Sequence, residues 1–212
     1  MATFAYILKG VFSFMTPDSR PATHDSHQKR CRDCKKQLIE LLAAIYGKCR
    51  VSHSFPWPTQ PTHYNGTAVG VALDRIYDGL RQLRGHRNFT RTEQMPPCDY
   101  YLPGPNFILE FDESQHFTRP RLVALSLYPP ELKVGFSIGR WIDLCRRIEA
   151  KDDEPFDRDE RRAWYDTLRD LIPTLHGLKP TVRLYSDDFQ WCSLRSDSVE
   201  DQKTFQSFLR GA

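Results

Sequence analysis

The segment 96–117, PPCDYYLPGPNFILEFDESQHF, predicts a β-hairpin that gathers acidic side chains on one face. Its centre, Pro103–Asn106, is a turn signal between two short runs rich in aromatic and β-branched residues. A loop of about four residues sets Asp99 opposite Glu110. Because side chains alternate between the two faces of a strand, Asp112 lies on the same face as this pair.

The other face of the hairpin is apolar. The same register sets Leu102 opposite Phe107, and alternation turns Leu109 and Phe111 away from the acidic residues. We therefore expect one face of the hairpin to pack into a core and the other to carry the chemistry.

Carboxylates on neighbouring strands repel one another, and the repulsion grows where water is partly excluded. A hard divalent cation offsets it, because Mg²⁺ binds carboxylate oxygens at roughly 2.0–2.1 Å and keeps open positions for water and substrate phosphates. Neutralisation by arginine or a raised carboxyl pKa offsets it equally well. Asp99, Glu110 and Asp112 are thus a candidate site for Mg²⁺ or Mn²⁺, with a salt-bridged surface as the alternative.

The order of motifs around these acidic residues resembles a known family. Asp99 followed eleven residues later by Glu110-x-Asp112 resembles the signature of the PD-(D/E)xK nuclease superfamily, which has the restriction-endonuclease fold. The very-short-patch-repair endonuclease branch is the more specific resemblance, and it covers about residues 33–186. Besides the acidic strand, it rests on Gln115-His116, on Arg158-Asp159-x-x-Arg162 opening a helix, and on Val182-Arg183-Leu184.

The resemblance implies metal-dependent hydrolysis of phosphodiester bonds in nucleic acid, with DNA favoured over RNA. It implies Asp99, Glu110 and Asp112 as ligands of Mg²⁺ or Mn²⁺, and His116 as the proton-transfer group. Gln115 would position water or hold Asp112. A helix before the acidic sheet would contribute a further carboxylate, for which Glu40 is the candidate. The candidate substrate-binding residues are Arg119, Arg121, Arg158, Arg162 and Arg183.

One departure from the superfamily pattern keeps other functions open. The third catalytic position is usually a lysine that orients water and balances charge, and here it is Asp112. A nuclease-like fold that has lost catalysis and binds nucleic acid or protein is therefore an alternative. A hydrolase acting on sugars, with Asp99 and Glu110 as acid and base, is a second one.

Apolar periodicity and turn residues predict an α/β or α+β domain with a mixed central sheet flanked by helices. We expect one domain over residues 1–212, with a restriction-endonuclease-like core over about 33–186 and a helical insertion over about 119–156 that covers or flanks the cleft. The expected helices span about 33–47, 67–84, 121–128, 138–149, 157–173 and 198–209, and further strands span 4–14 and 181–185.

Composition limits the function without choosing it. The 212 residues include 30 Lys and Arg against 27 Asp and Glu, so the net charge of +3 excludes a globally basic coat for nucleic acid. No segment has the pattern of a signal peptide or a membrane span, so we expect a soluble, cytoplasmic protein with its six cysteines reduced. Cys31 and Cys34 have finger-like spacing, but a helix separates them from Cys49 and His53, and we expect thiols there rather than a Zn²⁺ site.

Overall fold

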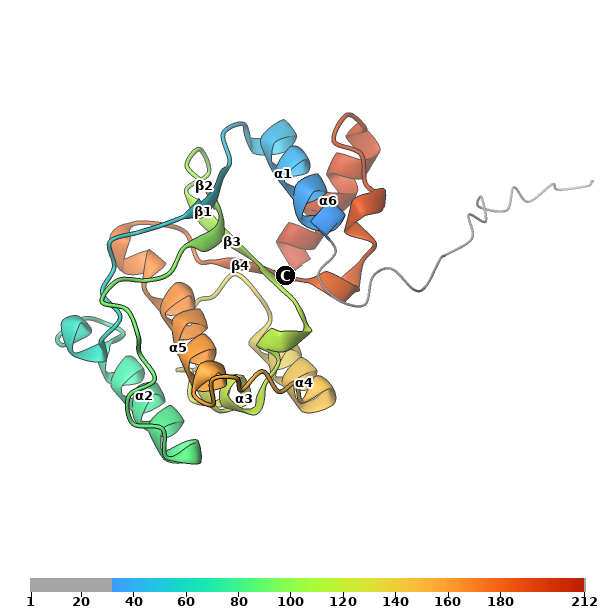
Figure 1. Ribbon diagram of the computed structural model, residues 1–212. Helices are drawn as coiled ribbons and strands as arrows, with labels where there is room; N and C mark the ends of the chain where they lie inside the picture. Colours follow the sequence, from blue (N-terminus) through green and yellow to red (C-terminus); the bar gives the residue numbers. More distant parts are fainter. Residues whose placement is uncertain (1–31, 212) are drawn as a thin grey trace, which may run out of the picture.

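A mixed four-stranded sheet organises the chain, whose computed structural model describes residues 32–211 (Figure 1). The strands lie in the order β1 (Arg50–His53), β2 (Cys98–Leu102), β3 (Phe107–Asp112) and β4 (Val182–Tyr185). The first three strands are antiparallel neighbours, and β4 runs parallel to β3. A parallel pair needs a long crossover connection, which here contains three helices.

The hairpin register agrees with the sequence prediction. Leu102 pairs with Phe107 and Tyr100 with Leu109, which brings Asp99 opposite Glu110. Leu109 and Phe111 lie in an apolar cluster on one side of the sheet, as the alternation predicted. All six residues of β3 are buried, so its acidic side chains also face protein rather than open solvent.

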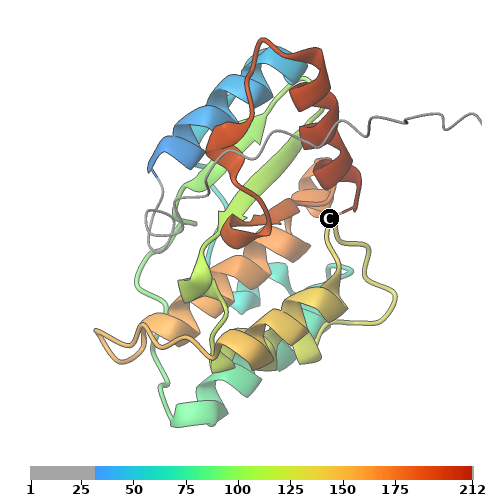
Figure 2. The same ribbon diagram turned by 90° about the vertical axis from the view of Figure 1, so that its right-hand side faces the viewer.

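Helices cover both faces of the sheet (Figures 1 and 2). One face packs against α1 (Arg32–Tyr46) and α6 (Val199–Gly211), with Leu38, Leu41 and Phe205 in the shared core. The other face carries α5 (Arg158–Leu171), whose apolar stripe includes Trp164 and Leu168. Helices α2 (Gly70–Arg84) and α3 (Arg119–Ser126) pack against α5, and α4 (Ile138–Ile148) packs against α3.

These elements confirm the predicted fold class of an α/β protein with a mixed sheet between helices. Each of the six expected helices is present with bounds within about three residues of those expected. Strand β1 was not predicted, because Arg50-Val51-Ser52-His53 lacks apolar alternation and lies mostly exposed at the edge of the sheet. The strand expected over 4–14 lies outside the described residues.

The expected helical insertion has a supporting position rather than a covering one. Helix α3 packs against α5 and α4 packs against α3, in the larger of the two apolar clusters. Neither helix contributes a residue to the lining of the acidic cleft described below. Of the two predicted positions, covering the cleft was wrong, because α3 packs against α5 and α4 packs against α3. Asp152 of the same segment pairs with Arg158 and Arg162 of the cleft lining, which agrees with the flanking position.

Two further sequence expectations concern membranes and cysteine. Within residues 32–211, none of the helices combines the length and the apolar character that crossing a bilayer requires. Cys31 lies outside the described residues, whereas Cys34 is buried in the core between α1 and the sheet.

Candidate functional site

A cleft of about 290 Å³ opens where β2 and β3 meet α5. The hairpin contributes Asp99 and Glu110 to it, and the short 3-10 helix η2 (Ser114–His116) contributes Gln115 and His116. From α1 comes Lys35, and Glu113 lies between the hairpin and η2. The side of the cleft formed by α5 consists of Arg158, Arg161, Arg162, Tyr165, Asp166 and Arg169.

Asp99 and Glu110 form the acidic pair that the sequence predicted. The backbone N–H of Asp99 donates to Glu110 Oε1 at 3.3 Å, and the backbone N–H of Phe111 donates to Asp99 Oδ2 at 2.9 Å. Both carboxylates are therefore fixed by the ladder of the hairpin. Arg169 Nε lies 3.3 Å from Glu110 Oε1 but makes no hydrogen bond.

Glu110 is buried next to another carboxylate, which changes its acidity. Burial raises the pKa of Glu110 to about 8; Arg169 opposes the rise, and Asp99 adds to it. The group is thus largely protonated near neutral pH unless a cation approaches it. A raised carboxyl pKa is one of the three ways of relieving the repulsion between neighbouring carboxylates that the sequence left open.

Asp112 does not join this pair. Its Oδ1 accepts a hydrogen bond from Arg183 at 2.7 Å and its Oδ2 accepts one from the Trp141 indole at 2.7 Å, and the residue is 1% exposed. Asp112 shares the face of Glu110, as alternation predicted, but β4 and α4 enclose its side chain. The prediction of a three-carboxylate metal site with Asp112 as a ligand was therefore wrong.

His116 and Asp166 form a second pair in the cleft. His116 Nδ1 lies 3.0 Å from Asp166 Oδ2, while Asp112 Oδ1 is 3.5 Å from the same nitrogen. Burial favours the neutral imidazole, but Asp166 and Asp112 outweigh it and raise the pKa of His116 above its ordinary value. With Nδ1 occupied by Asp166, Nε2 is the nitrogen left for a group bound in the cleft.

Behind the cleft, Arg183 lies at the centre of a buried ion network. Its guanidinium donates to Asp170 at 2.8 Å, to Asp112 at 2.7 Å and to Asp166 at 3.3 Å, and it is fully buried. Arg121 extends the network by donating to Asp170 at 2.7 Å. The prediction that Arg121 and Arg183 contact substrate phosphate was wrong, because neither guanidinium reaches the surface.

The remaining predicted site residues divide between the cleft and other surfaces. Gln115 lines the cleft and donates to Glu113 at 2.8 Å rather than holding Asp112. Arg158 and Arg162 also line the cleft, as expected of substrate-binding residues. Glu40 is exposed on α1 and is not part of the cleft, and Arg119 lines a separate hollow beside Glu149 and Asp153.

Five charged residues of the cleft were not predicted from the sequence: Lys35, Glu113, Arg161, Asp166 and Arg169. Asp166 and Arg169 follow Arg158 and Arg162 at helical spacing, so the periodicity of α5 would have placed all four on one stripe. Lys35 carried no comparable signal, because its position depends on how α1 packs against β3. Its Nζ lies 3.8 Å from Glu113 Oε1 and 6.0 Å from the centre of the Phe111 ring.

The chemistry of the cleft fits a hard cation only in part. Across the described residues, 32–211, no group of three or more His, Cys, Asp and Glu side chains is arranged to hold a metal ion. Asp99 and Glu110 still offer two adjacent carboxylates, and Mg²⁺ commonly uses one or two protein carboxylates while water and substrate phosphates complete its shell. The raised pKa of Glu110 results mainly from burial, and Arg169 compensates its negative charge only in part.

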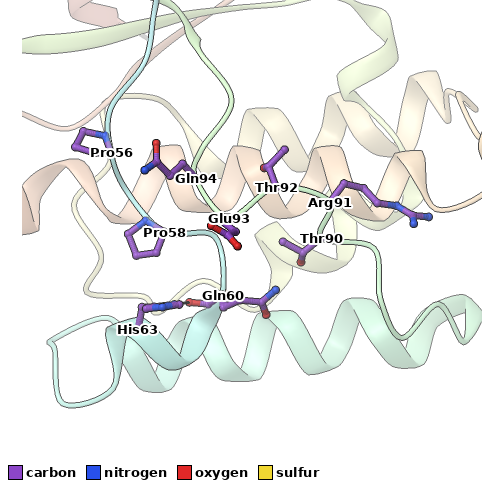
Figure 3. A pocket seen from close by; sticks show the side chains of 9 residues that line it. All are labelled: Pro56, Pro58, Gln60, His63, Thr90, Arg91, Thr92, Glu93 and Gln94. Carbon is purple, nitrogen blue, oxygen red and sulfur yellow. Dashed lines mark hydrogen bonds between the residues drawn. The ribbon is translucent and has the colours of Figure 1, made fainter.

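A larger hollow, of about 530 Å³, lies on the other side of the chain segment 90–97 (Figure 3). Two extended segments and the short helix η1 (Pro61–Tyr64) form it, with Gln60 and His63 facing Thr90 and Glu93. Its lining residues are mostly exposed and include neither Asp99 nor Glu110. Arg91 of this hollow and Arg161 of the cleft both donate to Asp157, so one carboxylate links the linings of the two depressions.

Comparison of the chain with protein-family models, with curated proteins and with solved structures gave no match in any of the three.

Proposed function

We propose that the chain is a metal-dependent endonuclease that hydrolyses phosphodiester bonds of nucleic acid, with DNA as the favoured substrate. One observation carries the proposal: two adjacent carboxylates, Asp99 and Glu110, share a cleft with the hydrogen-bonded pair His116 and Asp166. Arginines on α5 line the same cleft, and guanidinium groups bind phosphate well because their donors match its oxygens in pairs.

The carboxylate pair is the proposed cation site. Asp99 and Glu110 would hold Mg²⁺ or Mn²⁺, which activates water and stabilises the charge that develops on phosphate oxygens when bound. Asp112 has no part in this, because its two oxygens accept bonds from Arg183 and Trp141. Glu113 holds Lys35 and Gln115 at the edge of the cleft instead.

The other cleft residues supply proton transfer and charge. Asp166 fixes the imidazole of His116 in one orientation, so that Nε2 can protonate the leaving oxygen of the broken ester. The raised pKa, caused by Asp166 and Asp112, favours the proton-donating form of the imidazole. Lys35 supplies the ammonium group that the superfamily pattern expects at position 112, from a different element.

The order of elements agrees with the resemblance to the very-short-patch-repair branch. An acidic strand, β3, is followed by His116, then by α5, which opens with Arg158 and Asp159, and then by β4, which carries Arg183. Arg183, however, is buried in the interior and cannot contact substrate. The resemblance therefore extends to the order of the motifs but not to the role of Arg183.

Cleavage assays with matched variants test the proposal directly. Plasmid, single-stranded DNA and RNA are incubated with Mg²⁺ or Mn²⁺ and with the wild type, Asp99→Asn or Glu110→Gln. We expect the wild type to cut at least one substrate and each variant to lose about 100-fold or more of that rate, since each loses a metal-binding charge. Glu40→Gln, outside the cleft, is the control and should keep wild-type activity; equal cleavage by all four proteins would indicate a contaminating nuclease.

Metal affinity should depend on pH through Glu110. A carboxyl group must lose its proton to bind a cation, and the pKa of this one is raised to about 8. Affinity for Mn²⁺, measured by titration calorimetry without substrate, should therefore rise between about pH 7 and 9, by up to tenfold per pH unit below the pKa. Glu110→Gln should bind weakly and lose this dependence, whereas pH-independent affinity in the wild type would remove Glu110 from the site.

A binding module without catalysis is the second candidate. It is favoured by Arg169, which lies 3.3 Å from Glu110 and partly compensates the charge that a cation would otherwise compensate. In that case the chain would bind nucleic acid in EDTA as well as in Mg²⁺, and none of the substrates above would be cut.

A further inference from the structure

Phe156 is an aromatic side chain exposed to solvent, two residues before Arg158, which lines the cleft. It is 72% exposed, and it lies between Pro155 and Asp157, just before α5 begins at Arg158. Its ring stacks against the His86 imidazole at a centroid distance of 6.1 Å and an interplanar angle of 15°. With one face turned to His86 and most of its area exposed, the ring offers a flat surface to a ligand.

Carboxylates close to Phe156 in the sequence, Asp152 and Asp157, each pair with two arginines. Asp157 accepts hydrogen bonds from both Arg91 and Arg161, although its own side chain is only 7% exposed. Arg158 pairs with Asp152 and also donates to the carbonyl of Glu154 at 3.0 Å. A guanidinium has five N–H donors, so one shared carboxylate leaves donors on each arginine for phosphate.

The same arginines connect the ring to both depressions. Arg158 and Arg161 line the acidic cleft, whereas Arg91 lines the larger hollow and projects from one end of it (Figure 3). Arg161 and Arg91, which share the Asp157 carboxylate, therefore offer donors to a chain of phosphates that leads from the cleft toward the larger hollow, where the acidic lining residue is Glu93. The third hollow contains neither Arg91 nor Arg161; its charged lining residues are Arg84, Arg119, Glu149, Lys151, Asp153 and Asp159.

We propose that these side chains bind an unpaired stretch of nucleic acid, with one base stacked on Phe156. The set is here called the rim surface and consists of Phe156, His86, Arg91, Arg158 and Arg161. This deepens the proposed function, on which it rests, by naming single-stranded or locally opened nucleic acid as the substrate class. Base-paired duplex does not fit as well, because its base faces are covered by neighbouring bases. An apolar protein partner fits less well still, since within residues 32–211 the other exposed large apolar side chains lie on other elements: Val51, Val71, Leu175 and Val199.

A tryptophan at position 156 provides a direct test of stacking. The four tryptophans of the chain are all at most 5% exposed, so Phe156→Trp adds a solvent-exposed indole that dominates the accessible fluorescence. In EDTA, where no cleavage occurs, a single-stranded oligonucleotide should quench its emission in a saturable way. A duplex of the same sequence should quench it little; equal quenching by both would overturn the choice of an unpaired strand.

Affinity measurements test how much the ring contributes. By fluorescence anisotropy in EDTA, Phe156→Ala should bind a single-stranded oligonucleotide roughly 5- to 150-fold more weakly than the wild type, the usual range for losing one stacked base. Phe156→Tyr should restore most of the affinity. Val71→Ala, which removes an apolar side chain that is 84% exposed on α2, is the matched control and should change nothing.

The outcomes separate this inference from the proposed function. If Phe156→Ala binds single strands as tightly as the wild type, or if the wild type does not bind them, the rim surface is not a stacking site even where cleavage is observed. If Phe156→Ala loses affinity while no protein cuts any substrate, the rim surface stands and the hydrolytic proposal fails. An equal loss of affinity for single strand and duplex would reassign the ring to duplex binding and overturn the inference.

Discussion

Replacing Arg183 by methionine is expected to lower the free energy of unfolding by about 3–5 kcal/mol, the usual cost of removing one partner from a buried ion pair. The reason is the surroundings of the guanidinium: Asp112, Asp166 and Asp170 all accept hydrogen bonds from it, and all are at most 1% exposed. Without Arg183 these carboxylates must stay charged in the interior or take up protons. Urea denaturation at pH 7 measures the loss.

An exposed arginine supplies the control for this experiment. Arg147→Met, on the outer side of α4, should change the unfolding free energy by less than about 0.5 kcal/mol. A similarly small effect of Arg183→Met would mean that the network contributes little, as has been found where well-packed apolar residues replace buried ions.

Acid should weaken the same network. Burial raises the pKa of Asp166, but His116 and Arg183 outweigh it and hold that pKa well below the usual range. A carboxyl group with a depressed folded pKa stabilises the protein above its ordinary pKa, and the stabilisation is lost as pH falls through the folded value. The difference in stability between the wild type and Arg183→Met should accordingly shrink below about pH 4.

Replacing His116 by glutamine is expected to lower kcat for phosphodiester cleavage by about 10²–10⁴-fold, the range for losing a positioned general acid. Glutamine keeps the approximate size and a hydrogen-bond donor near Asp166 but cannot transfer a proton at neutral pH. The change should therefore act on kcat and leave KM for the nucleic acid within about threefold. Steady-state cleavage of a labelled oligonucleotide measures both constants.

The pH profile distinguishes proton transfer from a structural role. A protonated His116 is required in this mechanism, so activity should fall as pH rises through its raised pKa. Asp166→Asn removes the charge that raises this pKa, and it should shift the alkaline fall in activity to lower pH. His176→Gln, at an exposed histidine that stacks on Trp57, should leave the profile unchanged; an unchanged profile in Asp166→Asn as well would exclude His116 as the acid.

The hairpin could be predicted from sequence because its determinants are local. Turn residues at 103–106 and alternation in the flanking strands specify the register, and that register sets Asp99 beside Glu110. The helices followed from apolar periodicity in the same way. Strand β1 could not be found like this, because as an edge strand it needs no apolar face of its own.

What could not be predicted depends on contacts between distant segments. Asp112 looked like a third metal ligand because alternation places it on the face of Glu110, and only the parallel pairing of β3 with β4 brings Arg183 against it. Trp141 reaches the same carboxylate from α4, 29 residues further along the chain. The place of Lys35 in the cleft could not be predicted for a similar reason, because the packing of α1 sets its position rather than its neighbours in sequence.

The Arg183 network also bears on how such a chain can diverge. Replacing Asp112, Asp170 or Arg183 alone leaves an unpaired charge in the interior, so each single substitution lowers the free energy of unfolding strongly. Replacing all of these residues together by apolar ones lowers the free energy of unfolding much less. Descendants of a common ancestor are therefore expected to keep these positions together or to have exchanged them together, and such joint inheritance would identify distant relatives more reliably than the hairpin acids alone.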